Sequence, residues 1–245
     1  MNTLSTFDIK CAYWDSENFN VKVGALQVPS SISLSVDMLH SLQKMAKKDD
    51  YELIYIMLSD NRTIQMPYGN SELNLLFVDK KTTYTKIVTG EESQTTQIRS
   101  FKDSDSLSEL YLLAIESGKH SRFKLDFNFS PEVFEKMYRI WIERSVRKEI
   151  ADDVLVYEEA DHLRGMLTYK QFPNKAIIGL IAVSPVCQNL GIGSKLMKYL
   201  ELNLFRNGIT ELEVVTQGHN LQACQFYERN NFNVKDVTNI YHLWL

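Results

Sequence analysis

The sequence predicts an α/β protein in which a carboxy-terminal α/β domain, residues 99–245, follows a smaller α+β domain, residues 1–98. Two observations favour this division. In the second part, segments with helical and with strand periodicity follow in the order helix, helix, three strands, helix, strand, helix, strand. Between the parts, residues 79–108 are rich in Ser, Thr and charged residues and lack apolar periodicity, which is typical of a boundary.

The amino-terminal domain is predicted to contain two strands and one helix. Residues 20–28 and 51–58 have the composition of strands. Residues 36–47 carry apolar side chains at helical spacing, namely Met38, Leu39, Leu42 and Met45. One edge strand is expected inside the boundary region.

Two helices are predicted to open the carboxy-terminal domain. The first covers residues 107–117. The second begins at Ser130, because Ser caps helices, Pro131 suits the first turn and Glu132 suits the positive end of the helix dipole. Its apolar stripe consists of Val133, Phe134, Met137, Tyr138 and Trp141.

The remaining elements alternate between strands and helices. Three strands are predicted at residues 153–158, 165–170 and 176–183, and the third is apolar on both faces, as expected for a strand covered on both sides. The next helix carries Leu196, Leu200 and Leu204 on one face and is expected to end at Gly208. The last predicted elements are a strand at 211–217, a helix at 221–230 and a pair of strands between 232 and 245.

Composition argues against several classes of protein. Hydrophobic residues at 44% and charged residues at 24% are typical of an ordinary folded chain. With 27 basic and 31 acidic residues the net charge is −4, which does not favour nucleic acid or an anionic membrane as a partner. The longest apolar run, residues 176–183, is far shorter than the roughly 20 residues of a membrane-spanning helix.

Location and redox state are also expected from the sequence. The opening residues, MNTLSTFDIK, lack the basic and apolar regions of a secretory signal, so we expect a cytoplasmic protein. Cys11, Cys187 and Cys224 are far apart and form no C-x-x-C pair. This spacing favours reduced thiols and predicts neither a disulfide framework nor a cysteine zinc site.

A Q-x-x-G-x-G motif occupies residues 188–193, between the apolar strand and the helix after it. Its glycines let consecutive backbone N–H groups turn toward one point at a helix N-terminus, where an anion such as pyrophosphate is favoured. A dinucleotide-binding G-x-G-x-x-G would need glycine at Leu196, and Gly193-Ser194-Lys195 has the wrong order for a Walker A loop. Taken alone, the motif is equally compatible with a tight turn.

Four features in order carry a family resemblance. They are the strand end Leu180–Pro185, the Q-x-x-G-x-G loop, the strand ending at Gln217, and the pattern Asn220-x-x-Ala223-x-x-x-Tyr227 with Asn231-Phe232 after it. Together they resemble the GNAT family of acetyl-CoA-dependent N-acetyltransferases over residues 102–245. The resemblance implies a mixed, mostly antiparallel sheet flanked by helices, acetyl-CoA as cosubstrate and no metal.

The same resemblance implies a set of site residues. The coenzyme site would consist of Ile181, Ala182, Val183, Gln188, Asn189, Leu190, Gly191, Ile192, Gly193, Ser194, Asn220 and Ala223. The backbone of Ile181 and Val183 would pair with the pantetheine arm, and loop 188–194 would hold the pyrophosphate. Asn220 would contact the pantetheine or simply cap a helix. Tyr227 would be the general acid that protonates the departing thiolate, although a Tyr on a short helix is more often a core residue.

Two departures from the family pattern are visible. Asn231 stands where many members have glycine, and Asn tolerates the same left-handed conformation. Strand 176–183 lacks the carboxylate that often deprotonates the amine, so either water relays the proton or the amine arrives largely neutral. Cys187 or Cys224 could carry the acyl group, but neither has a His nearby in sequence, which favours direct attack in a ternary complex.

The GNAT resemblance implies that the acceptor substrate binds at the loop between the first two helices of the domain, residues 118–124. Residues 118–124, GKHSRFK, hold four potentially cationic side chains and no acid, which suits a phosphate or a solvated basic loop. Residues 121–123, 141–147 and 14–24 resemble the dTDP-fucosamine N-acetyltransferases, which acetylate the 4-amino group of a nucleotide-linked 4-amino-4,6-dideoxy sugar. This resemblance makes Arg122 and Phe123 candidate substrate-binding residues.

We therefore expect an acetyl-CoA-dependent N-acetyltransferase that acts on a nucleotide-linked amino sugar. Acetylation of a peptide or a small amine and a non-catalytic acyl-CoA-binding module are the alternatives. The expected partners are acetyl-CoA and a small-molecule amine, with no nucleic acid or membrane, and a homodimer is left open.

Overall fold

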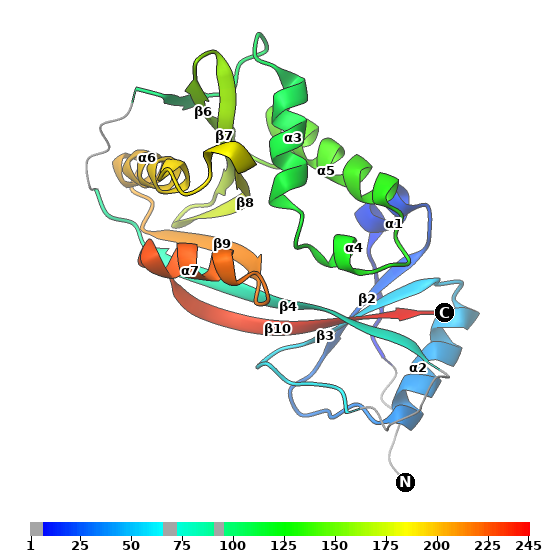
Figure 1. Cartoon of the computed structure of the whole chain (residues 1–245). Helices are drawn as coiled ribbons and strands as arrows, with labels where there is room; N and C mark the ends of the chain where they lie inside the picture. Colours follow the sequence, from blue (N-terminus) through cyan, green and yellow to red (C-terminus); the bar gives the residue numbers. More distant parts are fainter. Residues whose placement is uncertain (1–6, 66–72, 91–95) are drawn as a thin grey trace. The chain divides into compact units, whose positions relative to one another are not determined.

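The computed structural model describes residues 7–65, 73–90 and 96–245 (Figure 1). The chain forms two compact units, one of Met1–Thr82 with Asp236–Leu245 and the other of Thr83–Lys235. It passes from one unit to the other within two strands, β4 (Asn74–Ile87) and β10 (Asn233–Trp244). The predicted boundary lies at residue 98, whereas the chain divides within β4, and residues 236–245 join the first unit because β10 pairs with β3.

The first unit is a small α+β structure. Its other elements are β1 (Lys10–Cys11), α1 (Tyr13–Phe19), β2 (Val23–Val28), α2 (Val36–Lys48) and β3 (Leu53–Leu58). The strands follow the order β1-β2-β3-β10, in which β2 and β3 are parallel and the other neighbours are antiparallel. Helix α2 starts where the Ser35 hydroxyl accepts the Met38 N–H, and it buries Leu39 and Leu42 in the core of this unit, as its spacing predicts.

The second unit carries the predicted α/β domain. In chain order it contains the end of β4, β5 (Ile98–Ser100), α3 (Leu107–Ser117), α4 (Arg122–Leu125), α5 (Pro131–Val146), β6 (Asp153–Glu159), β7 (His162–Gln171), β8 (Lys175–Val183), the 3-10 turn Pro185–Cys187, α6 (Ile192–Arg206), β9 (Glu211–Gln217) and α7 (Leu221–Arg229). The strand order is β4-β9-β8-β7-β6-β5, mixed and mostly antiparallel, with β8 and β9 parallel. Helix α6 covers one face of the sheet, and α3 packed with α5 covers the other.

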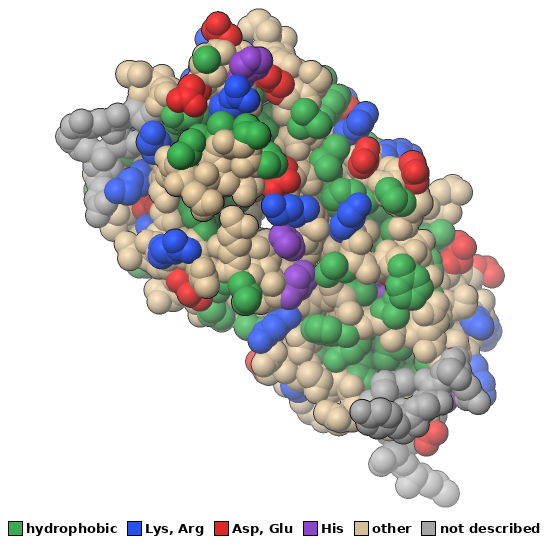
Figure 2. All heavy atoms as spheres, in the orientation of Figure 1, with side chains coloured by type: hydrophobic (Ala, Val, Ile, Leu, Met, Phe, Trp, Pro, Cys, Tyr) green, Lys and Arg blue, Asp and Glu red, His purple; other side chains and the backbone are tan. Residues whose placement is uncertain are grey.

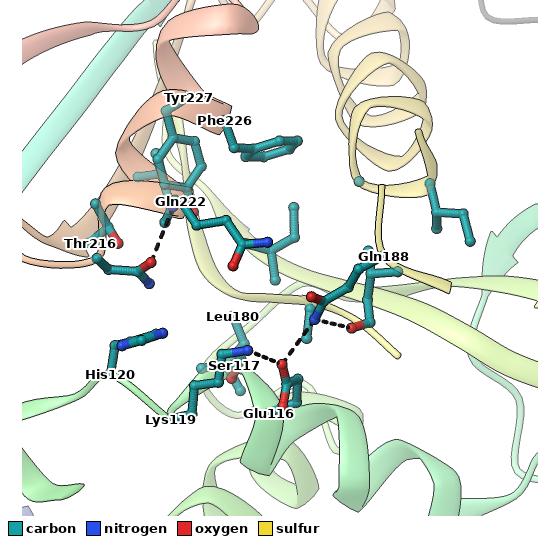
Figure 3. A pocket seen from close by; sticks show the side chains of 18 of the residues that line it. Glu116, Ser117, Lys119, His120, Leu180, Gln188, Thr216, Gln222, Phe226 and Tyr227 are labelled. Atoms are coloured by element: carbon teal, nitrogen blue, oxygen red, sulfur yellow. Dashed lines mark hydrogen bonds and ion pairs between the residues drawn. The ribbon is translucent and has the colours of Figure 1, made fainter. Parts of the chain in front are cut away.

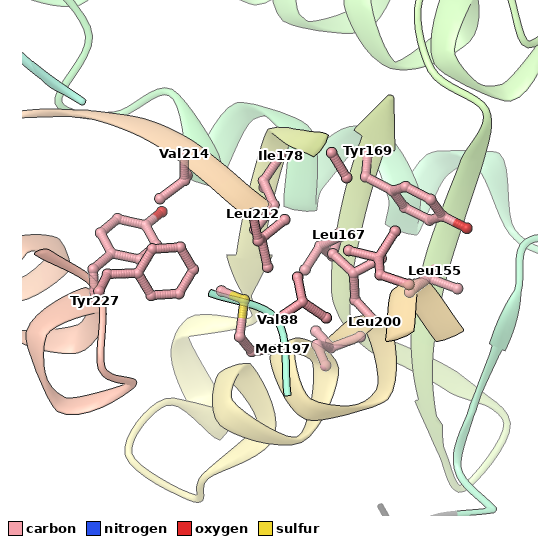
Figure 4. Close-up of a cluster of buried hydrophobic side chains, with 14 of the residues drawn as sticks. Val88, Leu155, Leu167, Tyr169, Ile178, Met197, Leu200, Leu212, Val214 and Tyr227 are labelled. Carbon is pink, nitrogen blue, oxygen red and sulfur yellow. The ribbon is translucent and has the colours of Figure 1, made fainter. Parts of the chain in front are cut away.

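The core of the second unit follows the predicted apolar stripe of α6. Leu196, Leu200 and Leu204 are fully buried against side chains of β6, β7 and β8. Figure 4 shows the cluster around Met197 and Leu200, with Tyr227 beside Val214 at one end of it. Tyr227 therefore belongs to the core as well as to α7.

Two segments differ from the sequence prediction. Residues 233–244 form the single strand β10 instead of a pair of strands, because Asn239–Trp244 pair with β3 and Lys235 is held by ion pairs to β9. The Thr-rich part of the expected boundary is a continuation of strand β4, in which Thr82 and Tyr84 are buried. Thr is β-branched and fits a strand well, so a polar composition did not indicate a loop here.

Candidate active site

A cavity of about 600 Å³ lies in the second unit, where strands β8 and β9 separate. The two strands pair from Lys175 opposite Glu211 to Ile178 opposite Val214, and no further partners are found between them in the described chain. Beyond this point residues 179–183 of β8 and residues 214–217 of β9 line the cavity. The backbone of β8 is thus open to a ligand on the side where β9 would otherwise pair.

The Q-x-x-G-x-G loop forms one end of the cavity. Asn189 (φ 64°) and Gly191 (φ 76°) take the left-handed conformation, and α6 begins at Ile192. Gly191 suits this turn because a side chain is strained at such a φ. The first turn of α6, residues 192–195, contains no acidic residue, so no acidic side chain of its own offsets the positive end of the helix.

Gln188 connects this loop to helix α3. Its Nε2 donates hydrogen bonds to the carbonyl of Val183 at 3.2 Å and to Oε1 of Glu116 at 3.0 Å (Figure 3). The same Glu116 oxygen accepts a hydrogen bond from Lys119 Nζ at 2.5 Å. Gln188 therefore holds the loop through one contact to strand β8 and one contact to helix α3.

Tyr227 projects into the cavity from α7 with its ring held among aromatic side chains. The rings of Phe226, Tyr84 and Phe232 lie 5.3, 5.6 and 5.7 Å from it. Burial, and to a smaller extent the nearby Cys224, raises the pKa of Tyr227 above its usual value, so the phenol is protonated at neutral pH. Tyr227 lines the cavity, which places it to contact a bound ligand.

Asn220, a predicted site residue, caps the start of helix α7. The Asn220 side chain accepts a hydrogen bond from the Ala223 N–H at 3.1 Å and caps the helix, and both residues line the cavity. The two roles considered for Asn220 are therefore compatible. At the other end of the helix Asn231 takes φ 65°, as expected from its place in the sequence.

Polar groups after α3 line the opposite side of the cavity. His120 and Lys119 belong to the turn that follows this helix. The ring of His219 lies 6.2 Å from that of His120, and its Nε2 donates a hydrogen bond to the His120 carbonyl at 3.0 Å. Figure 2 shows two histidine side chains side by side on this face, next to Lys or Arg side chains. Burial, and then electrostatic interactions with Lys119 and His219, lower the pKa of His120, which favours a neutral imidazole at pH 7.

The structure brings nearly all predicted coenzyme residues together. Of the predicted coenzyme residues, all but the exposed Leu190 line this cavity. The predicted substrate residues Arg122 and Phe123 lie on α4, outside the described lining, with the guanidinium of Arg122 4.7 Å from the centre of the Phe123 ring. Cys187 lines the cavity, whereas Cys224 is directed at the Gln217 carbonyl 3.7 Å away and is outside the described lining.

Glu116 and His120 were not singled out from the sequence. One feature of the sequence could have indicated Glu116: it is an acidic residue in the last turn of a helix, where the helix dipole favours basic residues. His120 was counted among cationic residues, but its surroundings favour the neutral form. Both features depend on the packing of this turn against residues far away in the chain.

Residues 121–232 match the model of the acetyltransferase (GNAT) family. This segment resembles a GNAT acetyltransferase domain. The match agrees with the predicted enzyme class, acetyl-CoA-dependent N-acetyltransferase, and with the predicted fold of this segment. Helix α3 and the turn with Glu116 and His120 precede the matched residues.

Similar proteins support the fold. A GCN5-related N-acetyltransferase from Sphaerobacter thermophilus superposes with a TM-score of 0.58 at 15% identity, covering 90% of this chain and 72% of that one. A conserved protein of unknown function from Staphylococcus epidermidis gives 0.66 at 13% identity, covering 94% and 87%. The curated relative SpsD, a spore coat polysaccharide biosynthesis protein of Bacillus subtilis (strain 168), is 24% identical over 146 residues. That alignment covers 58% of this chain and only 48% of SpsD.

No group of three or more His, Cys, Asp or Glu side chains in the described chain is arranged to hold a metal ion. Among the same residues, no helix has both the length and the apolar character that crossing a membrane requires.

Proposed function

We propose that this protein transfers the acetyl group of acetyl-CoA to the 4-amino group of a nucleotide-linked 4-amino-4,6-dideoxy sugar. The observation that carries the reaction is the joint opening of three features into one cavity: the free edge of β8, the N-terminus of α6 and the Tyr227 hydroxyl. The free edge of β8 suits an extended polar arm, the N-terminus of α6 suits an anion, and the Tyr227 hydroxyl suits a leaving group.

The residues present fit acetyl-CoA as a substrate. The backbone of Ile181 and Val183 offers donors and acceptors to the pantetheine arm, as a neighbouring strand would. The amides at the start of α6, after Gly191, would bind the pyrophosphate, since they point outward at the positive end of the helix. Gln188 keeps this loop in place through its bonds to Val183 and Glu116.

The proton transfers have one candidate on each side of the cavity. As the amine nitrogen bonds to the acetyl carbon and the carbon–sulfur bond breaks, Tyr227 gives its proton to the departing thiolate. His120, neutral and on the facing side in Figure 3, takes the proton that the amine loses. Direct attack in a ternary complex uses both groups and needs no cysteine.

A sugar amine as acceptor is supported by three observations. The relative SpsD is a polysaccharide biosynthesis protein. Lys119 and Arg229 bring positive charge to the cavity lining, which suits a diphosphate. Strand β8 has no carboxylate that could deprotonate the acceptor. An amine that is less basic than lysine depends less on such a base. Arg122 and Phe123 remain proposed contacts for the part of the nucleotide that extends beyond the cavity.

The test is release of free coenzyme A thiol from acetyl-CoA with four acceptors in parallel. These are dTDP-4-amino-4,6-dideoxygalactose, its glucose epimer, a lysine peptide and a small free amine. We expect release with a nucleotide sugar only. Release with the peptide or the small amine alone would overturn the substrate, and binding of acetyl-CoA without release from any acceptor would overturn the catalytic function.

A further inference from the structure

Strand β8 has an irregularity where it leaves β9. In the antiparallel pair of β7 and β8, Leu167 lies opposite Ile181, whereas Tyr169 lies opposite Ile178. One residue of β7, Thr168, therefore faces the two residues Gly179 and Leu180 of β8. This is the arrangement of a β-bulge, which bends the bulged strand and increases its twist.

The side chain of Thr168 fills this bulge. Its Oγ1 accepts a hydrogen bond from the Leu180 N–H at 2.9 Å, and the residue is only 1% exposed. A Cβ atom at Gly179 would lie 2.8 Å from the same oxygen, so the close approach of the hydroxyl requires glycine there. The hydroxyl thus takes the place of the backbone acceptor that the Leu180 amide would have in a regular strand pair.

The bulge coincides with the end of the pairing between β8 and β9. The last paired residue of β8 is Ile178, directly before Gly179. Ile181 and Val183, directly after the bulge, line the cavity. The bend in β8 therefore begins at the residue where the cavity opens.

We propose that Thr168 is a positioning residue for coenzyme binding: its hydroxyl holds the bulge that directs the free edge of β8 into the cavity. Thr168 does not itself line the cavity among the described residues, so it acts through Leu180 and the backbone that follows. The proposal rests on the proposed use of this edge by acetyl-CoA.

Two substitutions separate the hydroxyl from the volume of the side chain. Thr168→Val keeps the shape and removes the acceptor, whereas Thr168→Ser keeps the acceptor. We expect Thr168→Val to raise the Kd of coenzyme A about tenfold or more in calorimetry, and Thr168→Ser to stay within about threefold of wild type. Thr238→Val, which removes another buried threonine hydroxyl on β10, is the matched control and should leave the Kd unchanged.

A second measurement needs no ligand. Hydrogen exchange at the Leu180 amide should become faster in Thr168→Val and remain slow in Thr168→Ser and Thr238→Val. Thr168→Ala takes the place of Thr168→Val, with the same expectations, if the valine variant does not fold. An unchanged Kd of coenzyme A in Thr168→Val would overturn the proposal, whatever the exchange rate. Failure of the wild type to bind coenzyme A would overturn the proposed function instead, and faster Leu180 exchange would then still establish the role of the hydroxyl in the bulge.

Discussion

Gln188 and Glu116 are joined by a hydrogen bond of 3.0 Å from Nε2 to Oε1, across 72 positions of sequence. The bond links the first residue of the Q-x-x-G-x-G motif to the last turn of α3. The loop proposed to bind pyrophosphate and the turn that carries His120 are thereby connected, so the proposed coenzyme side and the proposed acceptor side of the cavity share this contact.

Gln188→Glu is expected to raise the KM for acetyl-CoA about tenfold. The new carboxylate would face the carboxylate of Glu116 and the carbonyl of Val183, and it could donate to neither. Steady-state kinetics at fixed acceptor concentration would measure the change. The exposed Gln65→Glu is the control for added charge, and an equal KM in both variants would contradict the role of Gln188.

Tyr227→Phe is expected to lower kcat by about 10²–10⁴ while the Kd of coenzyme A stays within a few-fold, because only the proton donor is lost. Tyr84→Phe is the matched control. Tyr84 contacts the Tyr227 ring at 5.6 Å, but its hydroxyl donates to Glu228 at 3.2 Å. Turnover near that of wild type in Tyr227→Phe would remove this residue from the acid role.

The acid limb of the pH profile should report His120. Its pKa is lowered from the usual value of about 6.5, mainly by burial and then by Lys119 and His219, while Glu116 acts in the opposite direction. The neutral form accepts protons, so kcat/KM should hold at neutral pH and fall only as the pH drops below the ordinary range of histidine. His120→Gln should lower kcat about 100-fold and abolish this limb.

The exposed His162, paired with Glu109 at 2.6 Å, is the control for the pH experiment. His162→Gln should leave both the rate and the limb unchanged. If the limb persists in His120→Gln, another group accepts the proton, and Glu116 is the next candidate in the lining.

Lys119→Ala and Arg122→Ala should each raise the KM for a nucleotide sugar about fivefold or more and leave the KM for acetyl-CoA nearly unchanged, because each removes a cation expected to face a phosphate. Lys124→Ala is the control within the same basic run, since Lys124 is not proposed to contact the substrate; its ammonium lies 5.1 Å from the centre of the Phe134 ring. Equal changes in both KM values would argue against recognition of the acceptor by these residues.

Glu201→Ala is expected to lower the free energy of unfolding by about 3–5 kcal/mol in urea denaturation. Glu201 and Lys86 form an ion pair at 2.8 Å with side chains only 7% and 9% exposed, so the substitution leaves a buried positive charge. Replacing both residues, as Lys86→Met with Glu201→Leu, should recover most of this loss. Glu135→Ala breaks the exposed pair with Arg139 and should cost less than about 1 kcal/mol.

Much of the fold was predictable because its signals are local. The helix at 107–117 and the strand at 211–217 have the predicted bounds, and Ser130 caps α5 as expected, with its hydroxyl accepting the Val133 N–H. Each depends on side chains within a few positions of one another. The single strand β10 was not predictable in this way, since its partner β3 lies far away in the sequence.

The sequence by itself determined the α/β class, most of the order of the elements and the glycine turn before α6, because turn geometry, capping and apolar periodicity are properties of neighbouring residues. The coenzyme role of that loop, and the roles of Asn220 and Tyr227, came from the family resemblance and remain proposals. Only the tertiary structure decided which polar groups meet in the cavity. Glu116 reaches Gln188, His120 loses its tendency to carry charge, and Thr168 enters a bulge in β8. These relationships depend on strand register and on burial, which bring together residues that no local pattern connects.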